Sequence, residues 1–390
     1  MKRKKVAILL PWLKMGGTNK VAIRFMNELV QYCDVTLILS QNVGELLEEV
    51  PKDVHVIIDE MQTFRDILKK DLKHFNLPYL FKDIIYYLKV KTGHDNIDNY
   101  RYIVERHTFV TEEMFDCAIS YHGQSPERLL NLVYRIHSRK KVVWIHGEMG
   151  FPEDQCRRMA KYYEKIDHFF FVSEPTKNTF IRKIPIDPNR TTVYYNRLDG
   201  TEIIEKAQET PDTTFSKDYA NLLTVGRVSS EKGQDMIPQI VRNLIDKGYA
   251  VRWYIIGDGP NMERIKDLII KESVDKNVFL LGVRNNPYPY MKACDIYIQP
   301  SYTEGYSTTI CEAGILGKAI IGTKPSGGIR DQIENERSGL IVDASVEGIE
   351  KGIIRLIEDP LLREKFEKNI LEKDFEGKGE ISKFIDYIEN

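Results

Sequence analysis

Short apolar runs, rich in β-branched and aromatic residues, recur along the whole chain with helical-period segments between them. This alternation restricts the fold more than any other feature, because it predicts parallel sheets covered by helices on both faces, the α/β class. Several runs are apolar at nearly every position, as strands buried on both faces should be. The runs are Val6–Leu10, Val35–Leu39, Val54–Ile58, Cys117–Tyr121, Val142–Ile145, Phe169–Val172, Val193–Tyr195, Leu222–Val225, Arg252–Ile256, Val278–Leu281, Ile296–Gln299, Ala319–Gly322 and Gly339–Val342. The helical segments include Lys20–Val30, Met236–Lys247, Met262–Lys271 and Ser307–Leu316.

The chain of 390 residues has room for two domains. A polar stretch from Asp199 to Ser216 precedes a fresh strand at Leu222. We therefore expect one Rossmann-like domain over residues 1–205 and a second over 206–375. The last segment, 376–390, predicts a short helix whose placement stays open. Residues 60–115 fit the alternation poorly and are interpreted as a basic, aromatic-rich helical insertion in the first domain.

The composition excludes several classes of protein. The formal net charge is −2, so nothing favours a nucleic-acid partner. No run of 18 apolar residues is present, so a transmembrane helix is not expected. The five cysteines contain no Cys-x-x-Cys pair, which argues against a zinc site or a disulfide framework and for a reducing compartment. Cys311 is interpreted as a small buried residue.

The strongest local motif runs from Gly226 to Gly233, directly after a predicted strand. Its glycines permit a sharp exit from the strand and a close backbone approach. Arg227 and Lys232 would then reach into the space beyond the strand end, where a guanidinium fork and an ammonium suit a diphosphate. The alternative is a surface loop with solvated charges.

A second motif runs from Glu304 to Glu312 and follows another strand. Ser307 is positioned to cap the next helix, whose first amide groups offer an anion site. A carboxylate accepts two adjacent sugar hydroxyls well, so one glutamate suits a transferred sugar and the other a ribose. The alternatives are a helix N-terminal charge for Glu304 and a partly buried ion pair for Glu312.

The first half contributes weaker candidates. Gly16 and Gly17 follow the first strand and allow a ligand to approach the backbone. They do not form Gly-x-Gly-x-x-Gly, which argues against a dinucleotide site. His146 follows a strand and suits a hydrogen bond to a sugar hydroxyl or a purely structural role. No Asp-x-Asp is present, so we expect no metal and charge neutralisation by Arg227 and Lys232 instead.

Together these residues resemble the retaining glycosyltransferases of family 4, which have the GT-B fold of two Rossmann-like domains with parallel sheets facing across a cleft. The resemblance covers Val6 to about Leu356 and rests on Gly-Arg…Lys-Gly, Gly-Asp-Gly-Pro at 257–260, two glutamates separated by seven residues, and Ser326-Gly327-Gly328. It implies a metal-independent hexosyltransferase that uses a nucleotide-sugar co-substrate, by default a UDP-sugar. Similar family members build bacterial surface polysaccharides on saccharide or lipid-linked acceptors.

The resemblance also implies roles. Arg227 and Lys232 would hold the donor diphosphate, Glu304 the sugar and Glu312 the ribose. The segment Gly305, Tyr306, Ser307 and Thr308 would line the donor, with Val283 and Arg284 at the nucleobase. Gly16 and Gly17 would approach the phosphates from the other domain, and His146 would match a sugar-proximal histidine. The family's usual Gly-Phe-Gly is Gly305-Tyr306-Ser307 here, which leaves the sugar open.

Other functions remain. The chain is alternatively a non-catalytic nucleotide-sugar-binding partner subunit, or a GT-B epimerase or phosphorylase. The basic, aromatic segment Phe64–Lys91 is either a helix on an anionic membrane surface or an ordinary solvated helix. The expected localisation is cytoplasmic, with peripheral association at the inner face of the plasma membrane as the membrane-bound alternative.

Overall fold

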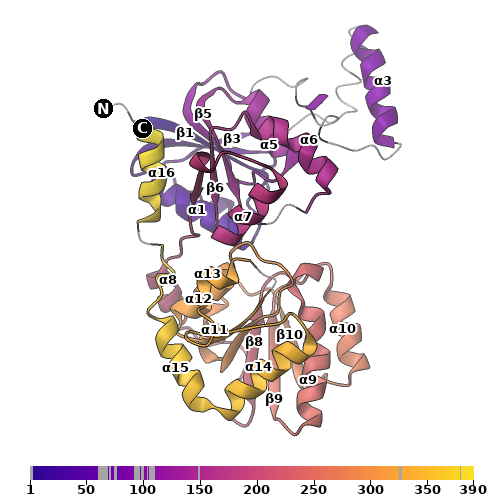
Figure 1. Cartoon of the computed structure of the whole chain (residues 1–390), viewed down its shortest axis with the longest axis vertical. Coiled ribbons are helices and arrows are strands. Elements are labelled where there is room, and N and C mark those ends of the chain that lie inside the picture. The colour runs from indigo at the N-terminus through magenta and orange to yellow at the C-terminus, as the bar shows by residue number, and fades with distance from the viewer. Residues whose placement is uncertain are drawn as a thin grey trace. The chain divides into compact units, whose positions relative to one another are not determined.

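The structure is a computed structural model (Figure 1), and it describes residues 3–59, 69, 72–73, 77–91, 97, 101–102, 104, 110–147, 150–324, 327–377 and 379–390. The chain divides into two compact units. The first comprises Met1–Val172, Thr176–Tyr194 and Gly379–Asn390, and the second comprises Ser173–Pro175 and Tyr195–Lys378. Each unit is built on its own sheet, and the chain passes from the first to the second at Tyr194 and Tyr195, whereas the sequence predicted the boundary at residues 205 and 206.

The first unit contains a seven-stranded sheet in the order β3-β2-β1-β4-β5-β6-β7, and every neighbouring pair is parallel. The first six strands each contain most of one predicted apolar run, whereas the last strand contains only Val193 of the predicted run Val193–Tyr195. The strands are β1 (Lys4–Leu10), β2 (Cys33–Leu39), β3 (His55–Ile58), β4 (Phe115–Ser120), β5 (Ser138–Ile145), β6 (His168–Phe171) and β7 (Thr191–Val193).

The second unit contains a six-stranded parallel sheet in the order β10-β9-β8-β11-β12-β13. The strands are β8 (Ala220–Val225), β9 (Val251–Ile256), β10 (Val278–Gly282), β11 (Ile296–Gln299), β12 (Ala319–Thr323) and β13 (Leu340–Val342). The two parallel sheets confirm the predicted α/β class.

Helices flank both sheets (Figure 1), and their apolar sides supply the two cores. The helices are α1 (Gly17–Leu29), α3 (Leu77–Lys91), α5 (Pro126–Arg135), α6 (Glu153–Tyr163), α7 (Glu174–Lys183), α8 (Gly200–Lys206), α9 (Ile237–Asp246), α10 (Met262–Lys271), α11 (Tyr288–Ala293), α12 (Thr308–Ile315), α13 (Ile329–Gln332), α14 (Val346–Glu358), α15 (Pro360–Ile370) and α16 (Glu380–Glu389). The expected insertion near 60–115 contains α3, but most of its other residues lie outside the described part of the chain.

Each sheet has one point where the strand order reverses. In the first sheet β1 pairs with both β2 and β4, and in the second β8 pairs with both β9 and β11. In open α/β sheets, ligands bind beyond the carboxyl ends of the strands at such a point. In the second unit, the motifs beginning at Gly226 and Glu304 follow these two strands.

The C-terminal helix α16 belongs to the first unit, although the chain reaches it from the second. Its Phe384 is fully buried and packs edge-on against Phe25 of α1, with ring centres 5.2 Å apart. It also lies against Phe170 of β6, with ring centres 5.7 Å apart. This helix therefore completes the aromatic core behind the first sheet.

Candidate functional site

The loop after β8 is held against the loop after β11 by a close backbone approach. Gly233 adopts the left-handed conformation (φ 66°), and a Cβ there would lie 2.2 Å from the carbonyl oxygen of Pro300. The N–H of Tyr302 donates to the carbonyl of Glu231 at 2.8 Å. Only glycine allows this approach without strain, so Gly233 determines where Lys232 lies.

The central contact of the site joins Lys232 and Glu304. The Lys232 Nζ lies 2.6 Å from Glu304 Oε1, and the two side chains are 23% and 9% exposed. The same carboxylate oxygen accepts hydrogen bonds from Gln299 Nε2 at 3.0 Å and from Ser301 Oγ at 2.9 Å. Three donors therefore fix one oxygen of Glu304, and no described group bonds to the other.

Gln299, the last residue of β11, connects this carboxylate to the next helix. It is 2% exposed, and its Oε1 accepts from the Tyr297 hydroxyl at 2.8 Å and from Thr309 Oγ1 at 3.1 Å. Sequence reasoning did not single it out. A glutamine at the end of an otherwise apolar strand could have indicated this role. A buried amide must find hydrogen-bond partners among its neighbours, so it marks a polar contact at that position.

Helix α12 begins at Thr308, and Ser307 caps it as predicted, with its hydroxyl accepting from the Ile310 N–H at 3.4 Å. A buried residue of α13, Gln332, also holds this helix start. It accepts from the Ser307 N–H at 3.1 Å and donates to the Ser307 carbonyl at 2.6 Å. Gln332 therefore bonds to both backbone groups of Ser307 and fixes the end of the loop Gly305–Ser307. The sequence motif does not reveal this role of Gln332.

Arg227 belongs to the same loop as Lys232, but its side chain is exposed. Its guanidinium makes no ion pair with the residues that the structure describes, and only its backbone carbonyl accepts a bond, from Gln234 Nε2 at 3.0 Å. Because no described group accepts from this guanidinium, and because it belongs to the loop that also contains Lys232, it is suited to an incoming anion.

Glu312 lies within α12 and is 6% exposed. Its Oε1 accepts a hydrogen bond from the Tyr288 hydroxyl of α11 at 3.4 Å. The carboxylate is therefore buried against a neighbouring helix, and it lies one and a half turns beyond the capped start of α12.

Val283 and Arg284 follow β10 at the adjacent edge of the site. Val283 is 54% exposed, whereas the Arg284 guanidinium bonds to the Tyr290 hydroxyl at 3.1 Å and pairs with Asp212 at 3.1 Å. The glycine motif nearby is structural: a Cβ at Gly257 would lie 1.9 Å from the Gly226 carbonyl oxygen. The loops after β8, β9 and β10 therefore stack on one another.

The remaining predicted residues belong to the first unit. Gly16 and Gly17 begin α1, and no side chain caps this helix start. His146 follows β5, with its ring 4.7 Å from Tyr121 and 5.8 Å from His122. Burial, and then the neighbouring His122, hold the pKa of His146 well below its usual value. His146 is therefore a neutral hydrogen-bonding group at neutral pH.

Cysteines and metal ligands add little to the site. All five cysteines are buried and unpaired. Burial raises the pKa of the Cys311 thiol to about 12, so it is inert, consistent with its interpretation as a buried residue. The described part of the chain contains no group of three His, Cys, Asp or Glu side chains arranged to hold a metal ion, and none of its helices is long and apolar enough to cross a membrane.

Comparisons with known proteins agree with this architecture. Residues 205–373 match the family model described as glycosyl transferases group 1. The structure of Alr3699/HepE from Anabaena, solved in complex with UDP and glucose, has a TM-score of 0.72 and 16% identity. The match covers 99% of this chain and 100% of that one. At this identity the likeness shows the fold alone. The chain has the GT-B fold.

Two curated relatives are similar to this chain in sequence. An uncharacterized glycosyltransferase of Haemophilus influenzae is 24% identical over 89% of this chain and 88% of its own length. The Campylobacter jejuni N-acetylgalactosamine-N,N'-diacetylbacillosaminyl-diphospho-undecaprenol 4-alpha-N-acetylgalactosaminyltransferase is 26% identical over 52% of this chain. The matches span 54%, 57% and 40% of three of the curated relatives. Together the findings support a GT-B glycosyltransferase.

Proposed function

We propose that the chain is a retaining, metal-independent glycosyltransferase of family 4 that moves a hexose-type sugar from a UDP-sugar to a saccharide or lipid-linked acceptor in bacterial cell-surface glycan synthesis. The observation that carries this proposal is the group at the switch point of the second sheet. There Lys232 and Glu304 are bonded at 2.6 Å, and the open guanidinium of Arg227 leaves the same loop. Two cations and an oriented carboxylate are what a sugar diphosphate needs.

In this mechanism the bond between the anomeric carbon and the diphosphate oxygen breaks with oxocarbenium character. The acceptor hydroxyl oxygen forms the new bond on the same face, and its proton passes to the leaving phosphate. Arg227 and Lys232 stabilise the charge that develops on the diphosphate. The unbonded oxygen of Glu304 accepts from the sugar hydroxyls, and Glu312 accepts from the ribose. Catalysis then rests mainly on positioning and charge stabilisation.

The other predicted residues have supporting roles in this proposal. The segment Gly305–Thr308 lines the donor with the amide groups at the start of α12, and Val283 and Arg284 lie at the nucleobase. Because the pKa of His146 is lowered, His146 donates or accepts a hydrogen bond to the sugar as a neutral imidazole and does not act as an acid.

Two comparisons support the substrate classes. The Anabaena structure was solved with UDP and glucose, which favours uridine as the base. The name of the Campylobacter relative includes a diphospho-undecaprenol substrate, which favours a lipid-linked acceptor. For this chain both remain part of the proposal.

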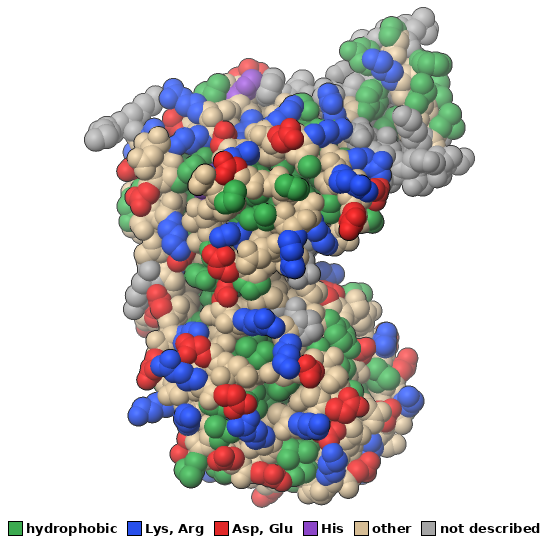
Figure 2. Space-filling view, viewed as in Figure 1, with side chains coloured by type: hydrophobic (Ala, Val, Ile, Leu, Met, Phe, Trp, Pro, Cys, Tyr) green, Lys and Arg blue, Asp and Glu red, His purple; other side chains and the backbone are tan. Residues whose placement is uncertain are grey.

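An exposed apolar side of α3 supports peripheral binding to a membrane that would carry such an acceptor. Phe81, Ile84 and Leu88 are 68%, 54% and 54% exposed and follow helical spacing. Figure 2 shows hydrophobic side chains over the surface that corresponds to α3. A helix that presents large apolar side chains to solvent beside an exposed lysine, Lys82, suits an anionic interface. Flotation with anionic liposomes at low salt tests this role, and absence of binding there would refute it.

The proposed function is tested by calorimetric titration with UDP, GDP, ADP and CMP, followed by NMR of the product anomer. We expect UDP to bind and the donor's anomeric configuration to be retained. An inverted linkage would remove the family assignment. Conversion of the donor without any acceptor would indicate an epimerase, and binding without any transfer by the isolated chain would indicate a partner subunit.

A further inference from the structure

The first unit has its own hollow at the switch point of its sheet, beyond the ends of β1 and β4. A space of about 330 Å³ is lined by His122, Gln124, Ser125 and Arg128, among others. An adjoining space of about 150 Å³ is lined by Trp12, the start of α1 and the same His122 and Arg128. Arg128 thus lies between the two hollows, at the place where open α/β sheets bind ligands.

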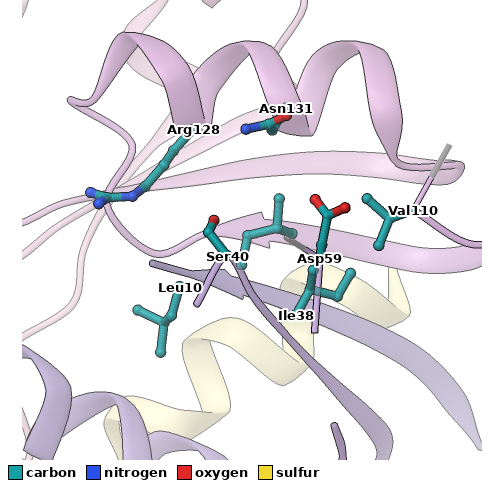
Figure 3. A pocket seen from close by; sticks show the side chains of 8 residues that line it. Leu10, Ile38, Ser40, Asp59, Val110, Arg128 and Asn131 are labelled. Carbon is teal, nitrogen blue, oxygen red and sulfur yellow. The ribbon is translucent and has the colours of Figure 1, made fainter. Parts of the chain in front are cut away.

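Arg128 is a partly buried cation without a carboxylate partner among the described residues. Seven residues later on the same helix, Arg135 has a bidentate partner in Asp59, with bonds of 2.6 and 2.8 Å. Figure 3 shows the Arg128 side chain extending away from Asp59. Its guanidinium carbon lies 5.7 Å from the ring centre of Trp12. Burial lowers the pKa of Arg128, and the charge of its chain neighbour Glu127 raises it.

A second, independent observation comes from the polar groups around Arg128. Within the described part of the chain the buried Oε1 of Gln124 has no hydrogen-bond partner, and Ser125 precedes α5 without capping it by its side chain. Pro126, the first residue of α5, has no N–H, so the first amide donors of the helix are those of Glu127 and Arg128. Ser125 does not cap them, and free helix amides beside a cation suit a phosphate. The Gln124 oxygen needs a hydrogen-bond donor, such as a ligand hydroxyl group, whereas the Arg128 guanidinium and the helix amides need an acceptor, such as a phosphate oxygen.

We propose that this hollow is an anion subsite for the acceptor, in which Arg128 and the start of α5 hold a phosphate group of the molecule that receives the sugar. The inference rests on the proposed glycosyl transfer and narrows its acceptor to a phosphate-bearing class. The donor diphosphate has its own cations, Arg227 and Lys232, in the second unit, so Arg128 is left for the acceptor. Gln124 and His122 are within the same hollow to bond to hydroxyl groups next to that phosphate.

The test is calorimetric titration of the intact chain with inorganic pyrophosphate in the presence of saturating UDP, which occupies the donor site. We expect Arg128→Met to weaken pyrophosphate binding tenfold or more and to leave UDP affinity unchanged. Arg128→Lys keeps the positive charge but loses the planar guanidinium that can form two parallel hydrogen bonds, so it should retain part of the affinity for pyrophosphate. The control is Arg158→Met, an exposed arginine of α6 that pairs with Asp154, and it should change neither affinity.

Stability separates a binding role from a structural one. Because Arg128 lacks a carboxylate partner, Arg128→Met should leave the free energy of unfolding unchanged or raise it. Equal pyrophosphate binding by the wild type and Arg128→Met, or no pyrophosphate binding at millimolar concentration, would overturn the proposal. So would a preference for glucuronate over pyrophosphate, which would assign a carboxylate ligand. If UDP does not bind at all, the proposed function fails. Pyrophosphate binding by Lys232→Met that still depends on Arg128 would support this subsite independently of the donor site.

Discussion

Lys232 Nζ lies 2.6 Å from Glu304 Oε1, and this ion pair joins the two loops at the switch point of the second sheet. Gln299 and Ser301 bond to the same oxygen, so the carboxylate is held even before a ligand arrives. A preorganised carboxylate loses little entropy on binding a sugar, which is what a site that works by positioning requires.

Removing Lys232 should therefore affect both stability and binding. We expect Lys232→Met to lower the free energy of unfolding by about 1–3 kcal/mol, because it leaves the largely buried Glu304 carboxylate without its cation. Glu304→Gln in the same chain should restore much of that loss. Urea unfolding of the two single variants and the double variant measures the coupling. Additive effects of the two substitutions would show that the pair contributes no coupling.

Arg227 should be important for rate and unimportant for stability. Its side chain is exposed and makes no described ion pair, so Arg227→Ala should leave urea unfolding unchanged. The proposed role against developing charge predicts a fall in kcat of about 10²- to 10³-fold. The matched control is Arg264→Ala, which removes an exposed arginine paired with Asp235 in the same unit and should keep full rate. Full transfer by Arg227→Ala would exclude the assigned role.

Gly233→Ala tests whether backbone approach positions Lys232. Both Gly233 (φ 66°) and Gly248 (φ 88°) are left-handed, but only at Gly233 would a Cβ meet a backbone oxygen, whereas nothing lies within 4 Å at Gly248. Gly248→Ala should cost roughly 1 kcal/mol from conformation alone. Gly233→Ala should cost more in thermal unfolding and should also weaken UDP binding. Equal losses in the two variants would mean that the Pro300 contact is unimportant.

The first unit should lose stability in acid through its buried histidines. Burial, then Arg190 and Lys140, lower the pKa of His168 from 6.5 to about 4. Above pH 6.5 the histidine is neutral in both states and stability is complete. Below pH 6.5 the histidine binds a proton in the unfolded state but not in the folded state. The free energy of unfolding therefore falls by about 1.4 kcal/mol per pH unit until the folded-state pKa is reached.

The check is urea unfolding between neutral pH and about pH 4. His122 should add to the same trend, because burial and Arg128 lower its pKa to about 3. His168→Phe removes one titrating group and should flatten the fall in stability with acid. An unchanged slope in His168→Phe would show that His168 does not contribute.

The C-terminal helix should be essential to the first unit. Phe384 is fully buried against Phe25 and Phe170, so Phe384→Ala should cost about 3–5 kcal/mol, the usual range for a buried phenylalanine. Phe384→Leu, which keeps most of the volume, should cost clearly less. Thermal unfolding of the two variants decides this, and equal stabilities would mean that the helix is only loosely attached.

Local pattern was sufficient to predict most of the strands of this protein. Strands such as Val6–Leu10 and Leu222–Val225 are buried on both faces. A strand buried in this way needs apolar residues at nearly every position, and such a run is visible in the sequence. The cap at Ser307 was also predictable, because the capping side chain bonds to an amide group within the first turn of the helix and so depends on local sequence.

Tertiary structure alone decided which of these elements meet. Lys232 and Glu304 are 72 residues apart and touch because β8 lies next to β11. Gln299 and Gln332 position the site through contacts that no local pattern encodes, and α16 returns to the unit that the chain had left. The physical reason is that apolar periodicity specifies how a segment is buried, whereas its partner depends on the packing of the whole sheet.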